Sequence, residues 1–380
     1  MNPRRWTLAA RSACAGLVLG CGSASAPGSA STSTCGASDA LWVASDYSSS
    51  AVGAVALSGN VTSVVGRVDL GADPALSVSR GRAFFVARDT DTLFELDPTC
   101  GTPTRQFNVH QGSVAGSSDP QDVAVASDGS LWVPLFNVPE VLILSPSGDI
   151  AGSIDLSSYD GDGNPNASAI AIVDTPSGEK AFVALGRLDD AAVFASVQPS
   201  WMLRVDVATA TVETYIVLAG RNPFGVMQND DGILWLAEPG NFDDAAESDA
   251  GVERFDTSNS TTALVALENA LGGSVAQVTV SAGCGAAIVA DATLHVNAES
   301  LALFDPATGQ VLAPASASPL ATDGFDLEGL TWARGALVVG DRRRASSGYP
   351  VHVFDGACAP VERADGVFLP LPPIAVSVVE

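Results

Sequence analysis

DPQDVAVASDGSLWVP, residues 119–134, contains the pattern that decides the fold. Two short apolar runs, Val123–Val125 and Leu131–Val133, flank the turn sequence Asp128-Gly129. Short apolar runs on either side of an Asp-Gly pair are typical of two antiparallel β-strands joined by a tight turn. The stretch therefore predicts a β-hairpin, and copies of its second strand recur along the chain.

This second strand appears seven times in the 380 residues, as two apolar residues, an aliphatic residue and usually a small one. The copies are Leu41–Ala44, Phe84–Ala87, Leu131–Pro134, Ala181–Ala184, Leu234–Ala237, Ala287–Ala290 and Leu337–Gly340. Successive copies lie 43 to 53 residues apart, and the flanking sequence predicts one strand before and two strands after most of them. Four strands every 40–50 residues, approximately, is the period of a β-propeller blade.

The two ends of the chain predict how the ring closes. Only six inner strands precede the seven copies, and Pro373–Val378, which matches Pro74–Val78, supplies the missing one. The C-terminal strand would complete the first blade and leave no open edge. The sequence therefore predicts an all-β fold, a single seven-bladed β-propeller of four-stranded antiparallel blades over residues 39–380.

The hairpin sequence also resembles a known repeat family. Asp119–Val125 followed by Asp128–Val133 is similar to the repeats of NHL- and YVTN-type propellers. The resemblance implies the same architecture over roughly residues 39–380. It leaves the activity open, because such propellers include scaffolds, binding proteins and lactonases, and a fold does not fix a function.

The N-terminus has the features of an export signal. Residues 1–20 combine three arginines with a short apolar stretch, which is the arrangement of a signal peptide. Leu17–Cys21 resembles the lipobox of bacterial lipoproteins, and this implies cleavage before Cys21 and lipidation of its thiol. The alternative is ordinary cleavage near Ala24–Ala26, which would leave a secreted protein.

Composition adds limits on the compartment and the partners. Residues 21–38 are rich in Ser, Ala, Gly and Thr, as in a flexible tether. We expect an outer-membrane lipoprotein of the bacterial cell envelope, periplasmic or surface-exposed, that touches the membrane only through its lipid. The net charge of -25 argues against nucleic acid, because counterion release needs clustered cations. We expect a monomer whose partner is a protein or a small molecule.

Four cysteines of the exported part have positions that the repeat defines. Cys100 and Cys358 each lie three residues after the Asp that ends a third strand, and Cys35 and Cys284 lie between first and second strands. An even number of cysteines in an exported chain suggests disulfides, although four cysteines allow three pairings. The repeat favours Cys35–Cys100 and Cys284–Cys358, each joining neighbouring blades.

Oxygen-bearing side chains precede or begin several inner strands, at the expected mouth of the central channel. Phe325–Leu330 contains Glu328-Gly329 and resembles the corresponding segment of gluconolactonase-like propellers. In that family Glu, two Asn and Asp hold a divalent metal, so the resemblance implies these roles for Glu328, Asn166, Asn222 and Asp122. Such ligands suit Ca²⁺. The alternative is that these Asp and Asn side chains form turns.

The same face is predicted to carry long loops with clustered charges. These are Asp160 and Asp162, Asp243 and Asp244, and the basic run Arg342, Arg343 and Arg344. Acidic loops of this kind are ordinarily solvated surface. The basic run either neutralises neighbouring acids or receives an anionic partner.

The usual motifs of hydrolases and nucleotide-binding enzymes are missing from the sequence, which has three His and no G-x-S-x-G or H-E-x-x-H. We therefore expect a non-enzymatic lipoprotein of the cell envelope that binds a ligand or a protein through its loop-rich face. One alternative is a divalent-metal-dependent lactonase or related hydrolase with its site at the channel mouth. Another is a purely structural envelope lipoprotein.

Overall fold

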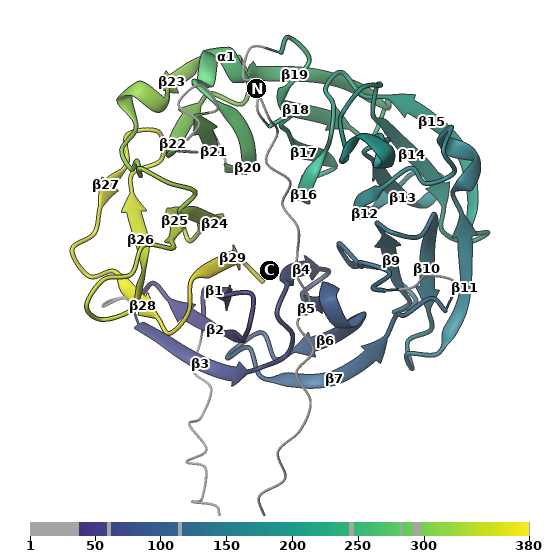
Figure 1. The fold of residues 1–380 in the computed structure, drawn as a ribbon, viewed down its shortest axis with the longest axis horizontal. Coiled ribbons are helices and arrows are strands. Elements are labelled where there is room, and N and C mark those ends of the chain that lie inside the picture. The colour runs from purple at the N-terminus through teal and green to yellow at the C-terminus, as the bar shows by residue number, and fades with distance from the viewer. Residues whose placement is uncertain are drawn as a thin grey trace, which may run out of the picture. The chain divides into compact units, whose positions relative to one another are not determined.

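The computed structural model describes residues 38–58, 62–112, 116–242, 247–281, 283–291 and 298–379. Seven antiparallel sheets are arranged as blades around a central channel (Figure 1). All seven copies of the repeated strand are second strands of blades, so the predicted seven-bladed propeller is confirmed. Cys21 and the predicted signal peptide and tether lie outside the described residues, apart from Ser38.

Each blade is named here by its strands from the channel outward. The first contains β29 (Pro373–Ser377), β1 (Ala40–Ser45), β2 (Ser50–Ala56) and β3 (Thr62–Val68). The second contains β4 (Pro74–Ser79), β5 (Arg82–Ala87), β6 (Thr92–Leu96) and β7 (Pro103–Asn108). The third contains β8 (Ala124–Val125), β9 (Leu131–Leu135), β10 (Glu140–Leu144) and β11 (Ile150–Asp155). The fourth contains β12 (Ala167–Thr175), β13 (Gly178–Leu185), β14 (Trp201–Asp206) and β15 (Thr211–Val217).

The remaining three blades follow the same order. The fifth contains β16 (Phe224–Asp230), β17 (Ile233–Glu238), β18 (Gly251–Asp256) and β19 (Thr261–Leu267). The sixth contains β20 (Ser274–Ser281), β21 (Cys284–Asp291), β22 (Ala298–Phe304) and β23 (Val311–Ala313). The seventh contains β24 (Leu327–Ala333), β25 (Ala336–Asp341), β26 (Tyr349–Asp355) and β27 (Val361–Glu362), and β28 (Val367–Leu369) also pairs with β26. A single α-helical turn, α1 (Glu268–Leu271), occurs among the described residues.

The C-terminal strand closes the ring as the sequence predicts. β29 pairs antiparallel with β1, with Ser377 opposite Leu41 and Val376 opposite Trp42. The first blade is therefore built from both ends of the chain. This pairing gives β1, a second strand, a neighbour on each side and leaves it no free edge.

The repeated segment of each second strand is apolar because these strands lie in the middle of a blade and are covered on both faces. In β1, Leu41 belongs to a cluster with Phe85 of the second blade, and Trp42 belongs to a cluster with Val338 of the seventh. Side chains alternate across a strand, so successive residues meet opposite neighbouring blades. A strand covered on both faces therefore needs a continuous apolar run, whereas a strand with one exposed face would alternate apolar and polar residues.

A disulfide joins the sixth and seventh blades. Cys284, at the start of β21, is bonded to Cys358, in the turn after β26, with 5.4 Å between their Cα atoms. This confirms the predicted Cys284–Cys358 pair. Cys100 is buried in the matching turn of the second blade. Cys35 lies outside the described residues, so the Cys35–Cys100 pair stays a prediction.

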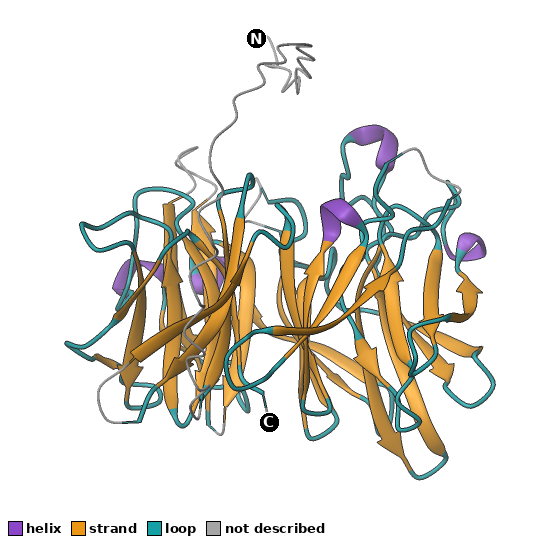
Figure 2. Ribbon diagram, turned by 90° about the horizontal axis from the view of Figure 1, so that it is seen from below, coloured by secondary structure: helices purple, strands orange, loops and turns teal. Residues whose placement is uncertain are grey.

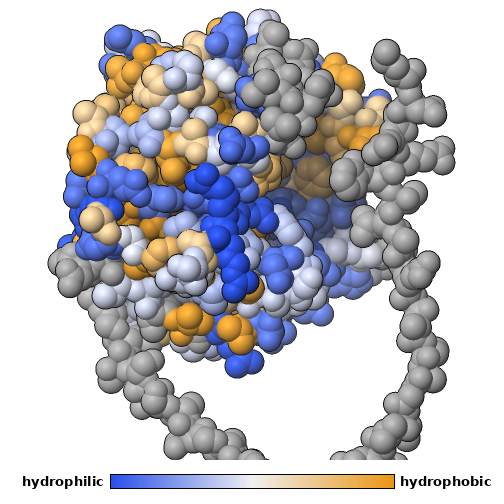
Figure 3. Space-filling view, turned by 60° about the vertical axis from the view of Figure 1, so that its left-hand side comes forward, coloured by the Kyte–Doolittle hydropathy of each residue, from blue (hydrophilic) through white to orange (hydrophobic). Residues whose placement is uncertain are grey.

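The two faces of the ring differ in their connections. Figure 2 shows long loops, several with short helical turns, mainly on one face, and tight turns mainly on the other. The long connections lead into inner strands or join second strands to third strands, as between β13 and β14. The outer side formed by the last blades presents a broad hydrophilic band with separate apolar patches (Figure 3). No helix in the described part of the chain is long and apolar enough to cross a membrane.

Candidate functional site

The inner strands surround a cavity of about 570 Å³ along the central channel. This volume lies within the range of roughly 300–1,000 Å³ that is typical of small-molecule sites. Its walls combine apolar side chains with a few charged and amide groups. The charged groups include Arg88 and Glu328, which come from the loop-rich face of two different blades.

A β-bulge brings Glu328 to the cavity. Leu327 pairs with Asp341 and Leu330 pairs with Val339, so Glu328 and Gly329 together oppose a single residue of β25. Gly329 has a φ of 88°, which a glycine adopts without strain. A bulge redirects the side chains beside it, and the Glu328 side chain lines the cavity with 19% of its surface exposed.

Arg342 is the direct partner of Glu328. It follows β25, and its Nη1 donates a hydrogen bond to Oε2 of Glu328. The same guanidinium lies 5.2 Å from the centre of the Tyr47 ring, and its Nη1 is 3.5 Å from the Tyr47 hydroxyl. An arginine held by a carboxylate and an aromatic ring has its planar fork fixed in orientation.

Arg88 is the second cation at the mouth. It follows β5, and its Nη2 lies 2.5 Å from Oδ1 of Asp73 while its Nη1 lies 3.5 Å from Oε1 of Gln121. Its charge also acts on Glu328, because it opposes the rise in the pKa of that carboxyl. Arg88, Arg342 and Glu328 therefore form one group, called here the arginine cluster.

Two carboxyls at this mouth titrate near neutral pH. Burial raises the pKa of Glu328 to about 7, although Arg342 and Arg88 oppose the rise. Burial likewise raises the pKa of Asp119 to about 6 against the nearby charge of Arg88. Carboxyls perturbed in this way are concentrated at functional sites. The arginine cluster can therefore gain positive charge as these groups take up protons.

Asp122, a predicted metal ligand, holds three inner strands together. It is 2% exposed, and its Oδ1 accepts hydrogen bonds from the Ser77 hydroxyl and the backbone N–H of Val123. Its Oδ2 accepts from the backbone N–H of Ile170 at 3.1 Å. Both oxygens are engaged, and they link the second, third and fourth blades.

Asn166 and Asn222 have equivalent places before β12 and β16, and both have left-handed backbone conformations with φ of 51° and 60°. Asn166 donates to Asp190 at 2.9 Å and accepts from the N–H of Leu188 at 2.9 Å. Asn222 donates to the carbonyl of Gly240 at 2.8 Å. Each amide thus ties the connection before an inner strand to the next long loop of the same blade.

The four predicted ligands therefore have separate partners. Asp122 bonds to groups of three blades, Asn166 and Asn222 bond to the loop of their own blade, and Glu328 bonds to Arg342. Within the described ranges, no three His, Cys, Asp or Glu side chains form a group that could hold a metal ion. The geometry gives no support to the Ca²⁺ site that the gluconolactonase resemblance implied.

The charged loop residues are also mostly engaged with the protein. Asp160 accepts a hydrogen bond from the Gln198 amide at 2.8 Å, and Asp162 accepts one from the N–H of Asn164 at 2.9 Å. Arg344 lies 5.9 Å from the ring centre of Tyr349. Asp243 and Asp244 lie outside the described residues.

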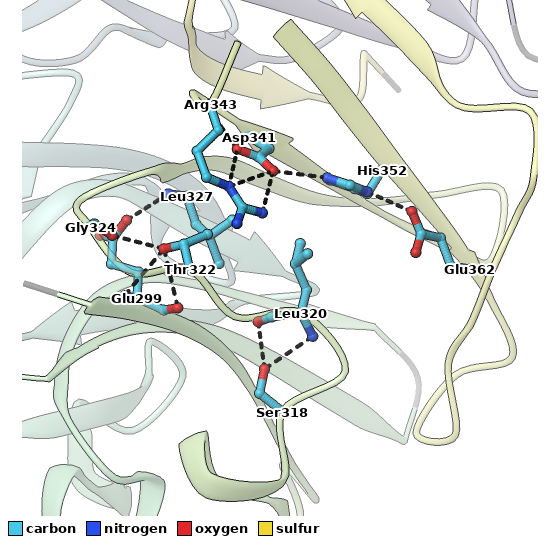
Figure 4. A network of polar contacts seen from close by, with 10 residues as sticks. All are labelled: Glu299, Ser318, Leu320, Thr322, Gly324, Leu327, Asp341, Arg343, His352 and Glu362. Carbon is cyan, nitrogen blue, oxygen red and sulfur yellow. Dashed lines mark hydrogen bonds and ion pairs between the residues drawn. The ribbon is translucent and has the colours of Figure 1, made fainter. Parts of the chain in front are cut away.

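Arg343 belongs to a polar network of the last blade, shown in Figure 4. It donates to Asp341, whose Oδ2 is also 3.2 Å from Nε2 of His352. The other ring nitrogen, Nδ1, is 2.6 Å from Oε1 of Glu362. Burial lowers the pKa of His352, but the two carboxylates outweigh it and the net shift is upward. The imidazole thus links β26 to the end of β25 and to β27 through its contacts with two carboxylates.

The sequence interpretation missed Arg88 and Tyr47. Both lie in connections that follow second strands, as Arg342 does, and such connections open on the loop-rich face. Their register in the repeat could therefore have identified them. The gluconolactonase resemblance implies oxygen ligands, and an arginine cluster lies outside that pattern.

Comparison with known proteins identifies the fold. No model of a known protein family matches the chain, and no curated protein matches its sequence. Among solved structures, a candidate 6-phosphogluconolactonase from Bacteroides uniformis matches with a TM-score of 0.57 at 12% identity, covering 90% of this chain and 99% of that one. Virginiamycin B lyase from Staphylococcus aureus gives 0.52 at 9% identity, covering 80% and 87%. The protein U3-55K gives 0.52 at 12% identity, covering 80% and 83%.

These matches differ widely in what their names describe, and at such low identity they carry no activity over to this chain. What they share with it is the ring of blades. The chain is a seven-bladed β-propeller.

Proposed function

We propose that this protein is a binding propeller of the cell envelope that takes a small anionic molecule at its channel mouth. The observation that carries the proposal is the arginine cluster: Arg88 and Glu328 line the 570 Å³ cavity, and Arg342 is paired with Glu328. A guanidinium presents a rigid fork of donors that matches a carboxylate or a phosphate.

The partial burial of the cluster favours an anion over water. The side chain of Arg342 is 14% exposed, so a ligand bound to it would meet a guanidinium that is already largely desolvated. When Glu328 is ionised, its carboxylate pairs with the Arg342 guanidinium. The pKa of Glu328 is about 7, so protonation near neutral pH releases Arg342 for a ligand.

Isothermal titration calorimetry with butyrate, gluconate and 4-phenylbutyrate tests the proposal. We expect at least one of these carboxylates to bind with 1:1 stoichiometry, and Arg342→Gln to weaken that binding about tenfold. Arg67→Gln is the matched control, because Arg67 is exposed on the outer strand β3. Absence of binding by all three probes, or unchanged binding by Arg342→Gln, would refute the proposal.

The envelope location rests on the N-terminal sequence. We propose that Cys21 is lipidated after cleavage of residues 1–20, and that the propeller is a monomer tethered to the bacterial outer membrane by this lipid. Metabolic labelling with an alkyne-tagged palmitate analogue in a bacterial host tests this. Label should be present in the wild type and absent from Cys21→Ala, and label retained by the variant would contradict the proposal.

A further inference from the structure

A second bulge shapes the channel mouth, in the fifth blade. In β16, Phe224 pairs with Ala237 and Gln228 pairs with Trp235, so three residues of β16 oppose one residue of β17. Gly225, inside this bulge, has a φ of 73°. The hydrogen-bond ladder between β16 and β17 is interrupted near the start of the inner strand, next to the loop-rich face, as it is at Glu328 in β24. Here, however, the bulge exposes apolar residues.

Phe224 and Val226 are exposed at this bulge. Phe224 is 47% exposed and Val226 is 41% exposed, and both line the cavity that Arg88 and Glu328 also line. The ring of Phe242 packs edge-on against Phe224, with 5.1 Å between the ring centres. Phe224 and Val226, supported by Phe242, are called here the apolar wall.

The apolar wall and the arginine cluster belong to different sides of the ring. The wall is in the fifth blade, while Arg88 follows a strand of the second blade and Arg342 follows one of the seventh. Figure 1 shows β16 across the channel from β4, the inner strand of the second blade, which also carries Arg88. A molecule lying over the mouth could therefore meet cations on one side and apolar carbon on the other.

We infer that the ligand of this channel mouth is amphipathic, with an anionic group for the arginine cluster and an aromatic group for the apolar wall, as in an aryl-alkyl carboxylate. This inference rests on the proposed function and adds the second half of the ligand. One cavity is lined both by the exposed apolar carbon of Phe224 and Val226 and by Arg88, and a ligand complementary to it carries both kinds of group.

The chemistry of the wall favours an aromatic group. Phe224 already makes an edge-on contact with Phe242, and its remaining exposed surface can take another ring in the same manner. Further into the channel the lining includes Ile172, Met227 and Leu330. An aromatic group that reaches past the wall would thus continue to contact apolar side chains.

Three matched probes test the inference in the full chain by calorimetry at pH 6. They are 4-phenylbutyrate, which has both groups, butyrate, which lacks the ring, and 4-phenylbutan-1-ol, which lacks the charge. We expect 4-phenylbutyrate to bind about tenfold more tightly than either of the others, because each loses one of the two contacts.

Two variants assign the contact to the wall. Phe224→Ala should weaken 4-phenylbutyrate binding about tenfold while leaving butyrate binding unchanged. Val226→Thr, which keeps the size and branching of the side chain, should weaken the same probe less. Phe368→Ala is the matched control, because Phe368 is 46% exposed on β28 at the outside of the ring.

The outcomes separate this inference from the proposed function. If butyrate binds as tightly as 4-phenylbutyrate, or if Phe224→Ala binds both probes like the wild type, the inference is overturned while an anion site remains. If the alcohol binds as tightly as 4-phenylbutyrate, the anionic half is wrong. If none of the carboxylates binds, the proposed function itself fails.

Discussion

Asp122 and Glu328 are two carboxylates beside inner strands, and the molecule uses them in opposite ways. Asp122 is 2% exposed and bonded to three donors from three blades. Glu328 keeps 19% of its side chain exposed, lines the cavity, and has Arg342 as its side-chain hydrogen-bond partner. The first carboxylate holds strands together, and the second pairs with a side-chain cation beside the cavity.

The difference shows what decides the role of a carboxylate in this ring. Burial raises the pKa of both carboxyls. For Asp122 the opposing groups are fixed hydrogen-bond donors, two of them from the backbone, whereas for Glu328 they are the side-chain cations Arg342 and Arg88. A backbone donor moves only when the strand moves, while a guanidinium can change its partner. The kind of donor, more than burial, therefore distinguishes the structural carboxylate Asp122 from the cavity carboxylate Glu328.

The largest expected effect comes from removing the structural carboxylate. Asp122→Ala should lower the free energy of unfolding by about 2–4 kcal/mol, because the buried N–H of Ile170 loses its acceptor and a small void remains. Chemical denaturation measures the change. Asp230→Ala, at an exposed position of β16, should change stability by less than about 0.5 kcal/mol. Equal losses of stability in the two variants would contradict a structural role for Asp122.

The next effect concerns Asp341, the structural carboxylate beside Arg342. Burial would raise its pKa, but His352 and Arg343 outweigh burial and lower it to about 2. Because folding raises the pKa of His352, its imidazole contributes fully to the free energy of unfolding below about pH 6.5. This contribution is lost as the pH rises through the pKa that His352 has in the folded protein. His352→Gln should cost about 1–2 kcal/mol at pH 5.5 and clearly less at pH 8.5. An equal cost at both pH values in denaturation experiments would contradict this assignment.

A smaller effect should appear in the pH dependence of binding. Between pH 8 and pH 6, Glu328 and then Asp119 take up protons beside Arg342, Arg88, Asp73 and Tyr47, so the mouth becomes more positive. We expect the affinity for 4-phenylbutyrate to rise several-fold, up to about tenfold, over this range. Glu328→Gln should remove most of that rise. A calorimetric series with the same slope in the variant would exclude Glu328 as the titrating group.

Most of the fold could be predicted from the sequence, because the signals are local and repeated. Seven copies of a wholly apolar strand indicate seven blades, and the match of Pro373–Val378 to Pro74–Val78 indicates how they close. The Cys284–Cys358 pair followed from the same register. These features depend on spacing along the chain, which a single sequence contains.

The candidate site could be predicted only as a face of the ring and two of its residues, Glu328 and Arg342. Glu328 and Arg342 were both singled out, but their pairing depends on a bulge at Gly329 that no spacing encodes. Arg88 lies far from them in sequence and lines the same cavity as Glu328 only because the ring closes. Asp122 and Asn166 have the residue types of ligands, and only their hydrogen-bond partners assign them to structure.

The most direct measurement compares 4-phenylbutyrate binding at pH 8 by Glu328→Gln and Arg342→Gln with binding by the wild type. At this pH Glu328 is mostly ionised and competes for Arg342. Glu328→Gln should therefore tighten binding several-fold, up to about tenfold, and Arg342→Gln should weaken it about tenfold. Opposite changes are the predicted result. Changes in the same direction, or no change in either variant, would contradict the account of the channel mouth as an anion site.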